Sequence, residues 1–201
     1  MGAYINIGND GFKRALRSEY VDKSGLIAEI NDTLFSEKCF TCVSRCRRFG
    51  KSMAAKMLCA YYDRSCDSRE LFKGLEIENH PSFEEHLNKY AVIYVDMTNF
   101  ITIYPHNTNI VDHIQSTLIK DIKKAYKNVE ISDTDNLMDV LVEISDVTGD
   151  KFFMIIDEWD AICREFDPKS QAMENYVNFL RRMFKSEKGQ RVFAGVYMTG
   201  I

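Results

Sequence analysis

The chain alternates between short, continuously apolar runs and longer segments in which apolar residues recur at helical spacing. The apolar runs predict four buried strands, at residues 39–44, 91–96, 152–157 and 191–199. The periodic segments predict helices at residues 22–30, 51–62, 110–127, 137–144 and 173–184. Residues 63–87 are polar and acidic, which indicates an irregular excursion with short helices. Strands that alternate with helices are typical of an α/β fold, with a mostly parallel sheet and helices on both faces.

Composition indicates one ordinary globular unit. The 201 residues are 45% hydrophobic and 28% charged, which is long enough for one α/β domain and short for two. The net charge of -4 does not indicate a nucleic-acid-binding surface. Residues 1–10 lack the basic start and apolar stretch of a signal peptide, and no window approaches the roughly 20 apolar residues of a membrane span. We therefore expect a cytoplasmic protein with reduced cysteines and no membrane partner.

Candidate chemistry begins at the first strand-to-helix junction. The segment Arg45-Cys46-Arg47-Arg48-Phe49-Gly50-Lys51-Ser52 lies between the strand at 39–44 and the helix at 51–62. It ends like a Walker A phosphate loop, in which backbone N–H groups surround a phosphate and the next helix points its positive end at it. Lys51 then reaches the β- and γ-phosphates, and the Ser52 hydroxyl binds Mg²⁺. The residues expected to bind the nucleotide are Arg45, Arg47, Arg48, Phe49, Gly50, Lys51 and Ser52.

The loop departs from the generic Gly-x4-Gly-Lys-Ser/Thr pattern at its first position, where Arg45 stands in place of glycine. That glycine eases a tight turn, so we expect a different entry into the loop. Two readings of Arg47 and Arg48 remain open. Either they add cationic contacts to the nucleotide or to a neighbour, or they are solvated surface charges.

A second motif ends the third predicted strand. The apolar run Phe152–Ile156 is followed by Asp157 and Glu158, which has the form of a Walker B motif. Asp157 is the candidate carboxylate for the Mg²⁺ shell, and Glu158 is placed to orient and deprotonate the attacking water. The alternative is that both carboxylates only cap a loop. Ligands of open α/β sheets bind at the carboxyl ends of the strands, where Lys51 and Ser52 also belong, and this favours the functional reading.

Thr199 ends the last predicted strand, which we expect to lie between the strands of the two motifs. Its hydroxyl can then sense the γ-phosphate or the lytic water, so Thr199 joins Lys51 and Glu158 as a candidate catalytic residue. The alternative reading is a buried threonine that bonds only to backbone.

These motifs resemble the predicted AAA-ATPase-like family of bacterial and archaeal P-loop proteins. The matching segments span nearly the whole chain and are Tyr20–Ile27, Arg45–Ser52, Ile155–Asp160 and Thr199–Ile201. An arginine-rich loop without the first glycine is a feature of that family; Cys46 and Trp159 depart from its usual residues, and neither removes a catalytic group. The resemblance implies ATP and Mg²⁺, and one domain over residues 1–201 with an N-terminal segment, 1–37, and a nucleotide-binding core, 38–201.

The resemblance also implies that longer relatives continue beyond the C-terminal residue of this chain. Full-length relatives usually continue into further helices and a C-terminal nuclease-like domain of the PD-(D/E)XK type, so we expect this chain to stop before the last strand and lid. The strand at 39–44 then keeps an open edge, which invites pairing with another copy of the chain. The segment Ala3–Ile7 is a candidate to cover that edge.

Three functions are compatible with these observations. The first is an ATP-hydrolysing motor or switch that uses Lys51, Ser52, Asp157 and Glu158. The second is a nucleotide-binding regulatory or interaction module with little turnover. The third is the ATPase part of a nucleic-acid-processing nuclease, which the acidic net charge disfavours for this chain alone. Binding of ATP is common to the first two, and only turnover separates them.

Overall fold

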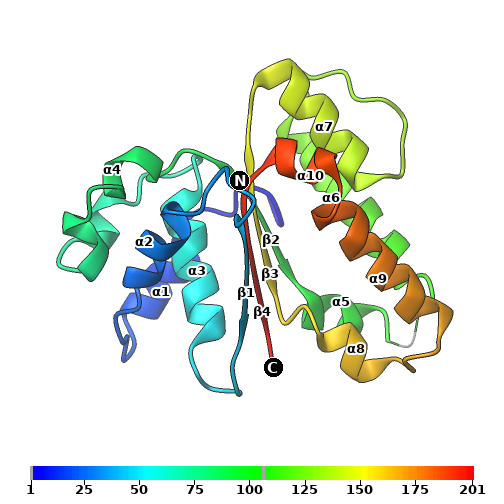
Figure 1. Ribbon diagram of the computed structural model, residues 1–201, viewed down its shortest axis with the longest axis horizontal. Coiled ribbons are helices and arrows are strands. Elements are labelled where there is room, and N and C mark those ends of the chain that lie inside the picture. The colour runs from blue at the N-terminus through cyan, green and yellow to red at the C-terminus, as the bar shows by residue number, and fades with distance from the viewer. Residues whose placement is uncertain (1, 106) are drawn as a thin grey trace.

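The computed structural model describes residues 2–105 and 107–201, and its centre is a four-stranded parallel sheet (Figure 1). The strands are β1 (Phe40–Ser44), β2 (Ala91–Asp96), β3 (Phe152–Asp157) and β4 (Phe193–Gly200). Their order across the sheet is β1-β4-β3-β2, and the pairings between them are parallel. The last strand therefore lies between the two motif strands, as predicted.

Helices cover both faces of the sheet. One layer holds the 3-10 helices η1 (Arg69–Phe72) and η2 (Glu76–Asn79) together with α1 (Asp10–Leu16), α2 (Gly25–Asn31), α3 (Lys51–Tyr62) and α4 (Phe83–His86) (Figure 1). The other layer holds α5 (Met97–Ile103), α6 (Ile110–Ala125), α7 (Leu137–Thr148), α8 (Ala161–Glu165), α9 (Gln171–Phe184) and α10 (Glu187–Val192). This is the predicted α/β architecture, and it is that of a P-loop NTPase-like fold.

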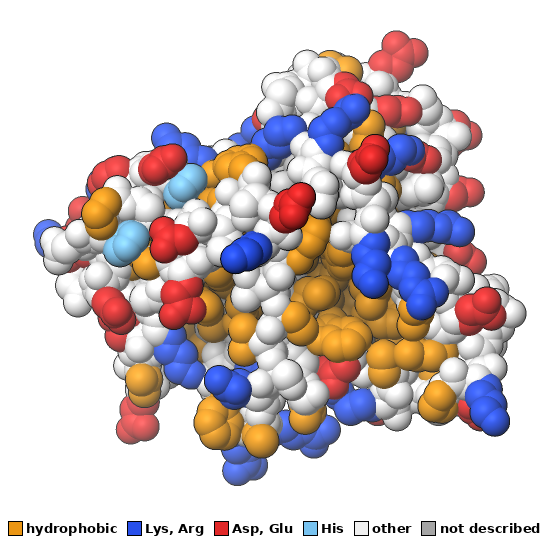
Figure 2. All heavy atoms as spheres, in the orientation of Figure 1, with side chains coloured by type: hydrophobic (Ala, Val, Ile, Leu, Met, Phe, Trp, Pro, Cys, Tyr) orange, Lys and Arg blue, Asp and Glu red, His pale blue; other side chains and the backbone are white. Residues whose placement is uncertain are grey.

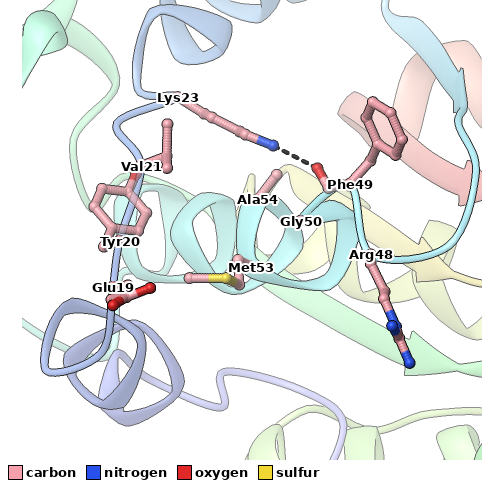
Figure 3. Close-up of a pocket in the computed structure, with 9 residues that line it drawn as sticks. All are labelled: Glu19, Tyr20, Val21, Lys23, Arg48, Phe49, Gly50, Met53 and Ala54. Carbon is pink, nitrogen blue, oxygen red and sulfur yellow. Dashed lines mark hydrogen bonds between the residues drawn. The ribbon is translucent and has the colours of Figure 1, made fainter.

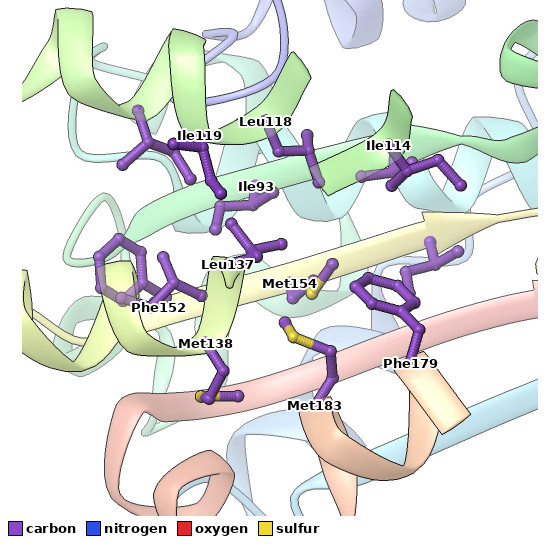
Figure 4. Packing of buried hydrophobic residues seen from close by; sticks show 14 of the residues in the cluster. Ile93, Ile114, Leu118, Ile119, Leu137, Met138, Phe152, Met154, Phe179 and Met183 are labelled. Atoms are coloured by element: carbon purple, nitrogen blue, oxygen red, sulfur yellow. The ribbon is translucent and has the colours of Figure 1, made fainter. Parts of the chain in front are cut away.

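The sheet separates two apolar cores because strand side chains alternate between its faces. On β3, which is buried along its whole length, Phe153 and Ile155 join the core beneath α3. Phe152 and Met154 join the opposite core, where they pack against α6, α7 and α9 (Figure 4). A strand that is buried on both faces has a continuous apolar sequence. For this reason β3 could be predicted from the sequence.

Local signals set several helix boundaries. The Asn136 side chain accepts the Met138 N–H at the start of α7, and Gly149, with φ 74°, ends that helix in the left-handed conformation. The Ser186 hydroxyl accepts the Gly189 N–H and starts α10. Because of that cap, Arg191 and Val192 are helical and β4 begins at Phe193, two residues later than predicted.

The N-terminal segment pairs with the sheet at the edge opposite to the one expected. Ile5 forms an antiparallel bridge with Ile93 on β2, and the Tyr94 N–H donates to the Tyr4 carbonyl at 2.8 Å. The expectation that residues 3–7 cover the β1 edge was wrong. Ile5 is fully buried in the core that packs against α6, α7 and α9. Burial of this side chain decides that the N-terminal segment pairs with the β2 edge of the sheet.

In the part of the chain that the structure describes, no helix is both long enough and apolar enough to cross a membrane.

Candidate functional site

The parallel register brings the ends of β1, β3 and β4 to one edge of the sheet. Val43 on β1 lies opposite Thr199 on β4, and Ile156 on β3 lies opposite Met198. The loop that follows β1 is bound to the same edge, because the Arg45 N–H donates to the Gly200 carbonyl at 3.2 Å. Both sequence motifs and Thr199 therefore meet at the carboxyl end of the sheet, where ligands of open α/β sheets bind.

The loop before α3 turns through two left-handed residues, Arg48 with φ 68° and Gly50 with φ 77°. Gly50 is the residue before the first helical turn, and a Cβ there would lie 2.8 Å from Lys23 Nζ. Its φ favours glycine, whereas the close approach involves only the end of a flexible lysine side chain. Lys23 comes from the N-terminal segment and donates to the Phe49 carbonyl, which ties that segment to the loop (Figure 3).

Lys51 is buried although it is charged, with 8% of its surface exposed. Its Nζ donates to the Arg45 carbonyl at 2.9 Å and to the Cys46 carbonyl at 3.3 Å, and it lies 3.5 Å from Glu158 Oε1. A buried ammonium needs such partners to offset its lost hydration. The loop thus folds around Lys51, which links the loop before α3 to the residue after β3.

Asp157 ends β3 and is almost fully buried. The Thr199 hydroxyl donates to Asp157 Oδ1, and the Tyr94 hydroxyl lies 3.4 Å from Oδ2. Burial, together with the charge of Asp157, raises the pKa of Tyr94 well above its usual value, so this hydroxyl keeps its proton and remains a donor. Asp157 is therefore held in one orientation by two neutral groups.

Glu158 follows in the left-handed region, with φ 54°. Its N–H donates to Thr199 Oγ1 at 3.2 Å, and the Trp159 N–H donates to the Thr199 carbonyl at 2.8 Å. These bonds hold a conformation that a non-glycine residue adopts at a cost of order 1–3 kcal/mol, a kind of strain that is concentrated at functional sites. The turn directs Asp157 and Glu158 to different surroundings, the first buried and the second at the cavity wall.

Sequence reasoning did not identify Arg164, which lies on α8 close to Glu158. Its Nη2 is 3.0 Å from Glu158 Oε2, and its Nη1 pairs with Asp160. The i, i+4 spacing of Asp160 and Arg164 is the sequence signal that could have indicated this pair. The pairing with Glu158 has no such signal, because it depends on the turn between β3 and α8.

Two cavities flank the loop. The first, of about 440 Å³, is lined by Arg47, Arg48, Gly50, Lys51, Ser52, Met53, Thr98, Glu158 and Arg164. The second, of about 380 Å³, is lined by Glu19, Tyr20, Val21, Lys23, Arg48, Phe49, Gly50, Met53 and Ala54 (Figure 3). Arg48, Gly50 and Met53 line both, so the two cavities adjoin at this loop.

Not all the predicted site residues line the first cavity. Ser52 and Lys51 line it together with Glu158, Arg47 and Arg48. Asp157 and Thr199 do not line it, because they are buried behind its wall. Phe49 lines the second cavity, and Arg45 lines a smaller hollow of about 190 Å³ at the same loop. Thr98, which the sequence did not indicate, completes the wall of the first.

The residues predicted to hold Mg²⁺ are suited to that ion. Mg²⁺ prefers oxygen ligands and keeps several waters, so one hydroxyl and one carboxylate are a sufficient protein contribution. Ser52 lines the first cavity, and Asp157 keeps its carboxylate oriented by Thr199 and Tyr94. The described residues contain no cluster of three or more His, Cys, Asp or Glu side chains that could hold a metal ion.

Comparison with known proteins agrees with the resemblance seen in the sequence. Residues 6–201 match the profile of a protein family described as predicted AAA-ATPase. No curated protein matches the chain.

Proposed function

Because the chain belongs to the predicted AAA-ATPase family, we propose that it binds ATP with Mg²⁺ at the loop before α3 and hydrolyses it. One observation carries the proposal: Lys51, Ser52 and Glu158 line a single cavity at the carboxyl end of a parallel sheet. A cation, a hydroxyl and a carboxylate around a helix N-terminus are the groups that phosphoryl transfer needs.

In this proposal the triphosphate enters the first cavity. The N–H groups of the loop and of the first turn of α3 bind phosphate oxygens, and Lys51 exchanges its carbonyl partners for the β- and γ-phosphates. Phosphate competes well for Lys51, because two neutral carbonyls are weaker acceptors than a phosphate anion. Ser52 and Asp157 are the residues that would hold Mg²⁺, and the ion, when bound, would supply positive charge beside the triphosphate.

The second cavity is proposed as the site of the nucleoside. The γ-phosphate end belongs beside Glu158, which lines the first cavity but not the second, so the nucleoside would extend away from Glu158 into the adjoining second cavity. Tyr20, Val21 and Phe49 offer apolar surface there, and Val21 and Phe49 are 71% and 59% exposed. Exposed apolar side chains around a hollow are typical of a ligand site. The N-terminal segment would thus belong to the nucleotide site rather than to a separate unit.

Hydrolysis follows from the position of Glu158. The carboxylate accepts a proton from water as the water oxygen attacks the γ-phosphorus and the bond to ADP breaks. The products are ADP and inorganic phosphate. The Thr199 hydroxyl supports this step through the Glu158 backbone, because it accepts the Glu158 N–H.

A specific observation favours the second candidate function, nucleotide binding with little turnover. Both oxygens of Glu158 face cations, Lys51 and Arg164, so the proposed base is occupied before any nucleotide arrives. A base bound in two ion pairs accepts a proton poorly until those pairs are broken. Turnover is then slow wherever nucleotide binding does not release Glu158.

The decisive test is calorimetric titration of the protein with Mg-ATP. We expect binding by the parent chain, at least a tenfold loss in Lys51→Ala and none in the control Lys38→Ala, which removes an exposed lysine before β1. Equal affinity in Lys51→Ala and the parent would show that the loop is not the site. Release of phosphate, measured on the same samples, separates the two functions.

A further inference from the structure

Glu158 and Arg164 form an ion pair that must break before Glu158 can accept a proton during ATP hydrolysis. Arg164 Nη2 lies 3.0 Å from Glu158 Oε2, while Lys51 lies 3.5 Å from the other oxygen. All three side chains line the cavity proposed for the triphosphate. Arg164 is therefore within the site, and it contacts the group that must receive a proton.

We propose that Arg164 recognises the γ-phosphate and thereby makes the site selective for a triphosphate over a diphosphate. The inference rests on the proposed function and adds a residue to it. Before nucleotide binds, Arg164 holds Glu158; when a triphosphate enters, the guanidinium exchanges the carboxylate for the γ-phosphate. A diphosphate does not reach Arg164, so Glu158 stays paired.

The exchange is favoured by the chemistry of the two partners. The Arg164 and Glu158 side chains are 31% and 20% exposed, and ion pairs that water reaches are weak. A γ-phosphate carries more charge than a carboxylate and matches the planar fork of a guanidinium with two parallel hydrogen bonds. The phosphate is therefore the stronger partner for Arg164.

Asp160 keeps Arg164 in the cavity during this exchange. It pairs with Nη1 of Arg164, whereas Glu158 pairs with Nη2. Asp160 itself is fixed, because its Oδ2 also accepts the Ile201 N–H at 3.3 Å. Arg164 needs to change only one of its two partners.

Release of Glu158 requires both cations to move to the nucleotide. Lys51 is expected to turn to the β- and γ-phosphates, and Arg164 to the γ-phosphate. Only a triphosphate satisfies both, and it leaves the carboxylate free to accept the proton from water. Arg164 would thus couple recognition of ATP to activation of Glu158 as the base.

The test compares affinities for ADP and for a non-hydrolysable ATP analogue, both with Mg²⁺, by calorimetric titration. For Arg164→Gln we expect the preference for the triphosphate to fall by about tenfold, with ADP affinity unchanged. Arg164→Lys keeps the charge but loses the fork, so it should lie between Arg164→Gln and the parent. The matched control is Arg69→Gln, which breaks an arginine–carboxylate pair with Glu84 away from the site and should leave the preference unaltered.

A double-mutant cycle separates recognition from a structural role. Glu158→Gln releases Arg164 from its competing partner, so the preference for the triphosphate should rise about threefold. In Glu158→Gln/Arg164→Gln that gain should vanish. A structural role for Arg164 would change both affinities together and would not couple to Glu158.

The outcomes distinguish the two proposals. Unchanged ADP affinity shows that the variants are folded with an intact loop. An unaltered triphosphate preference in Arg164→Gln, together with weakened binding in Lys51→Ala, overturns the role of Arg164 and keeps the proposed function. If the parent chain binds neither nucleotide, the proposed function fails, and the inference fails with it.

Discussion

Thr199 is the residue that holds the end of β3 in place. It is fully buried, and its hydroxyl accepts the Glu158 N–H at 3.2 Å while it donates to Asp157. One hydroxyl thus fixes the backbone of the proposed base and the side chain of the proposed Mg²⁺ ligand. The alternative that Thr199 bonds only to backbone is wrong, because its donor goes to a carboxylate.

We predict that Thr199→Val lowers both stability and turnover. The valine removes the hydrogen-bond partner of Asp157 Oδ1 and of the Glu158 N–H, while the Tyr94 hydroxyl still faces Asp157 Oδ2, and this loss costs about 1–3 kcal/mol of unfolding free energy. The same change loosens the base and should slow hydrolysis by about tenfold or more. Denaturant melts and phosphate release measure the two effects. Thr199→Ser keeps the hydroxyl and should stay near the parent in both; loss of turnover in the serine variant would contradict this role.

Glu158→Gln tests the base directly. The amide cannot accept a proton, so turnover should fall by about 10² or more while ATP still binds. The measurement is phosphate release at saturating Mg-ATP, with affinity determined on the same protein. Glu165→Gln, an exposed glutamate at the end of α8, is the matched control. Hydrolysis at the parent rate in Glu158→Gln would remove the residue from the mechanism.

At the scale of elements, helix ends position the strands that carry the site. α7 stops at Gly149, and β3 begins three residues later at Phe152. The abrupt stop requires a left-handed residue, which glycine supplies without a steric cost. The cap therefore decides where the chain leaves α7 and enters the central strand.

Gly149→Ala should destabilise the fold by about 1 kcal/mol, because alanine has to adopt φ 74° at that position. A Cβ there would meet nothing within 4 Å, so the cost is conformational rather than steric. Equilibrium denaturation measures it. Gly149→Asn is the control, since asparagine tolerates the left-handed region and should lose less. An alanine variant as stable as the parent would contradict the prediction.

At the scale of the whole molecule, the two sheet edges differ. The β2 edge is paired with the N-terminal segment through Ile5, whereas β1 has no strand beside its outer edge among the described residues. Figure 2 shows hydrophobic side chains gathered in the hollow between the two helical layers, on the face where Figure 1 places β1. Phe40 on β1 and Phe184 on α9 are partly buried apolar residues, and their ring centroids are 5.8 Å apart.

The self-association expected from the sequence stays a prediction, and β1, the strand predicted to carry it, lies at an edge of the sheet. An open apolar edge pairs readily with a second copy of the chain. We expect light scattering to show concentration-dependent dimers, and Cys42→Lys, at an exposed position on β1, to suppress them. Val147→Lys places the same charge at an exposed apolar position on α7 and should not. A parent chain that stays monomeric at high concentration would contradict this prediction.

The sequence by itself determined the fold class, the place of the last strand between the two motif strands and the position of the loop between β1 and α3. Those features have local signals: continuous apolar runs for strands buried on both faces, and a glycine at the point where the loop needs a left-handed turn. The short helices α1, α5, α8 and α10 have weaker signals, because five to seven residues hold too few periodic positions.

Only the tertiary structure decided how Glu158 is held and which edge the N-terminus covers. Arg164 reaches Glu158 through a turn whose left-handed residue is Glu158 itself, and no residue type in the sequence indicates that conformation. Ile5 pairs with β2 because the α6 core can bury its side chain there, and this depends on packing between segments about 90 residues apart. The spacing of apolar residues predicts the secondary structure of one segment at a time. Contacts such as these depend on the surfaces that several segments bury together.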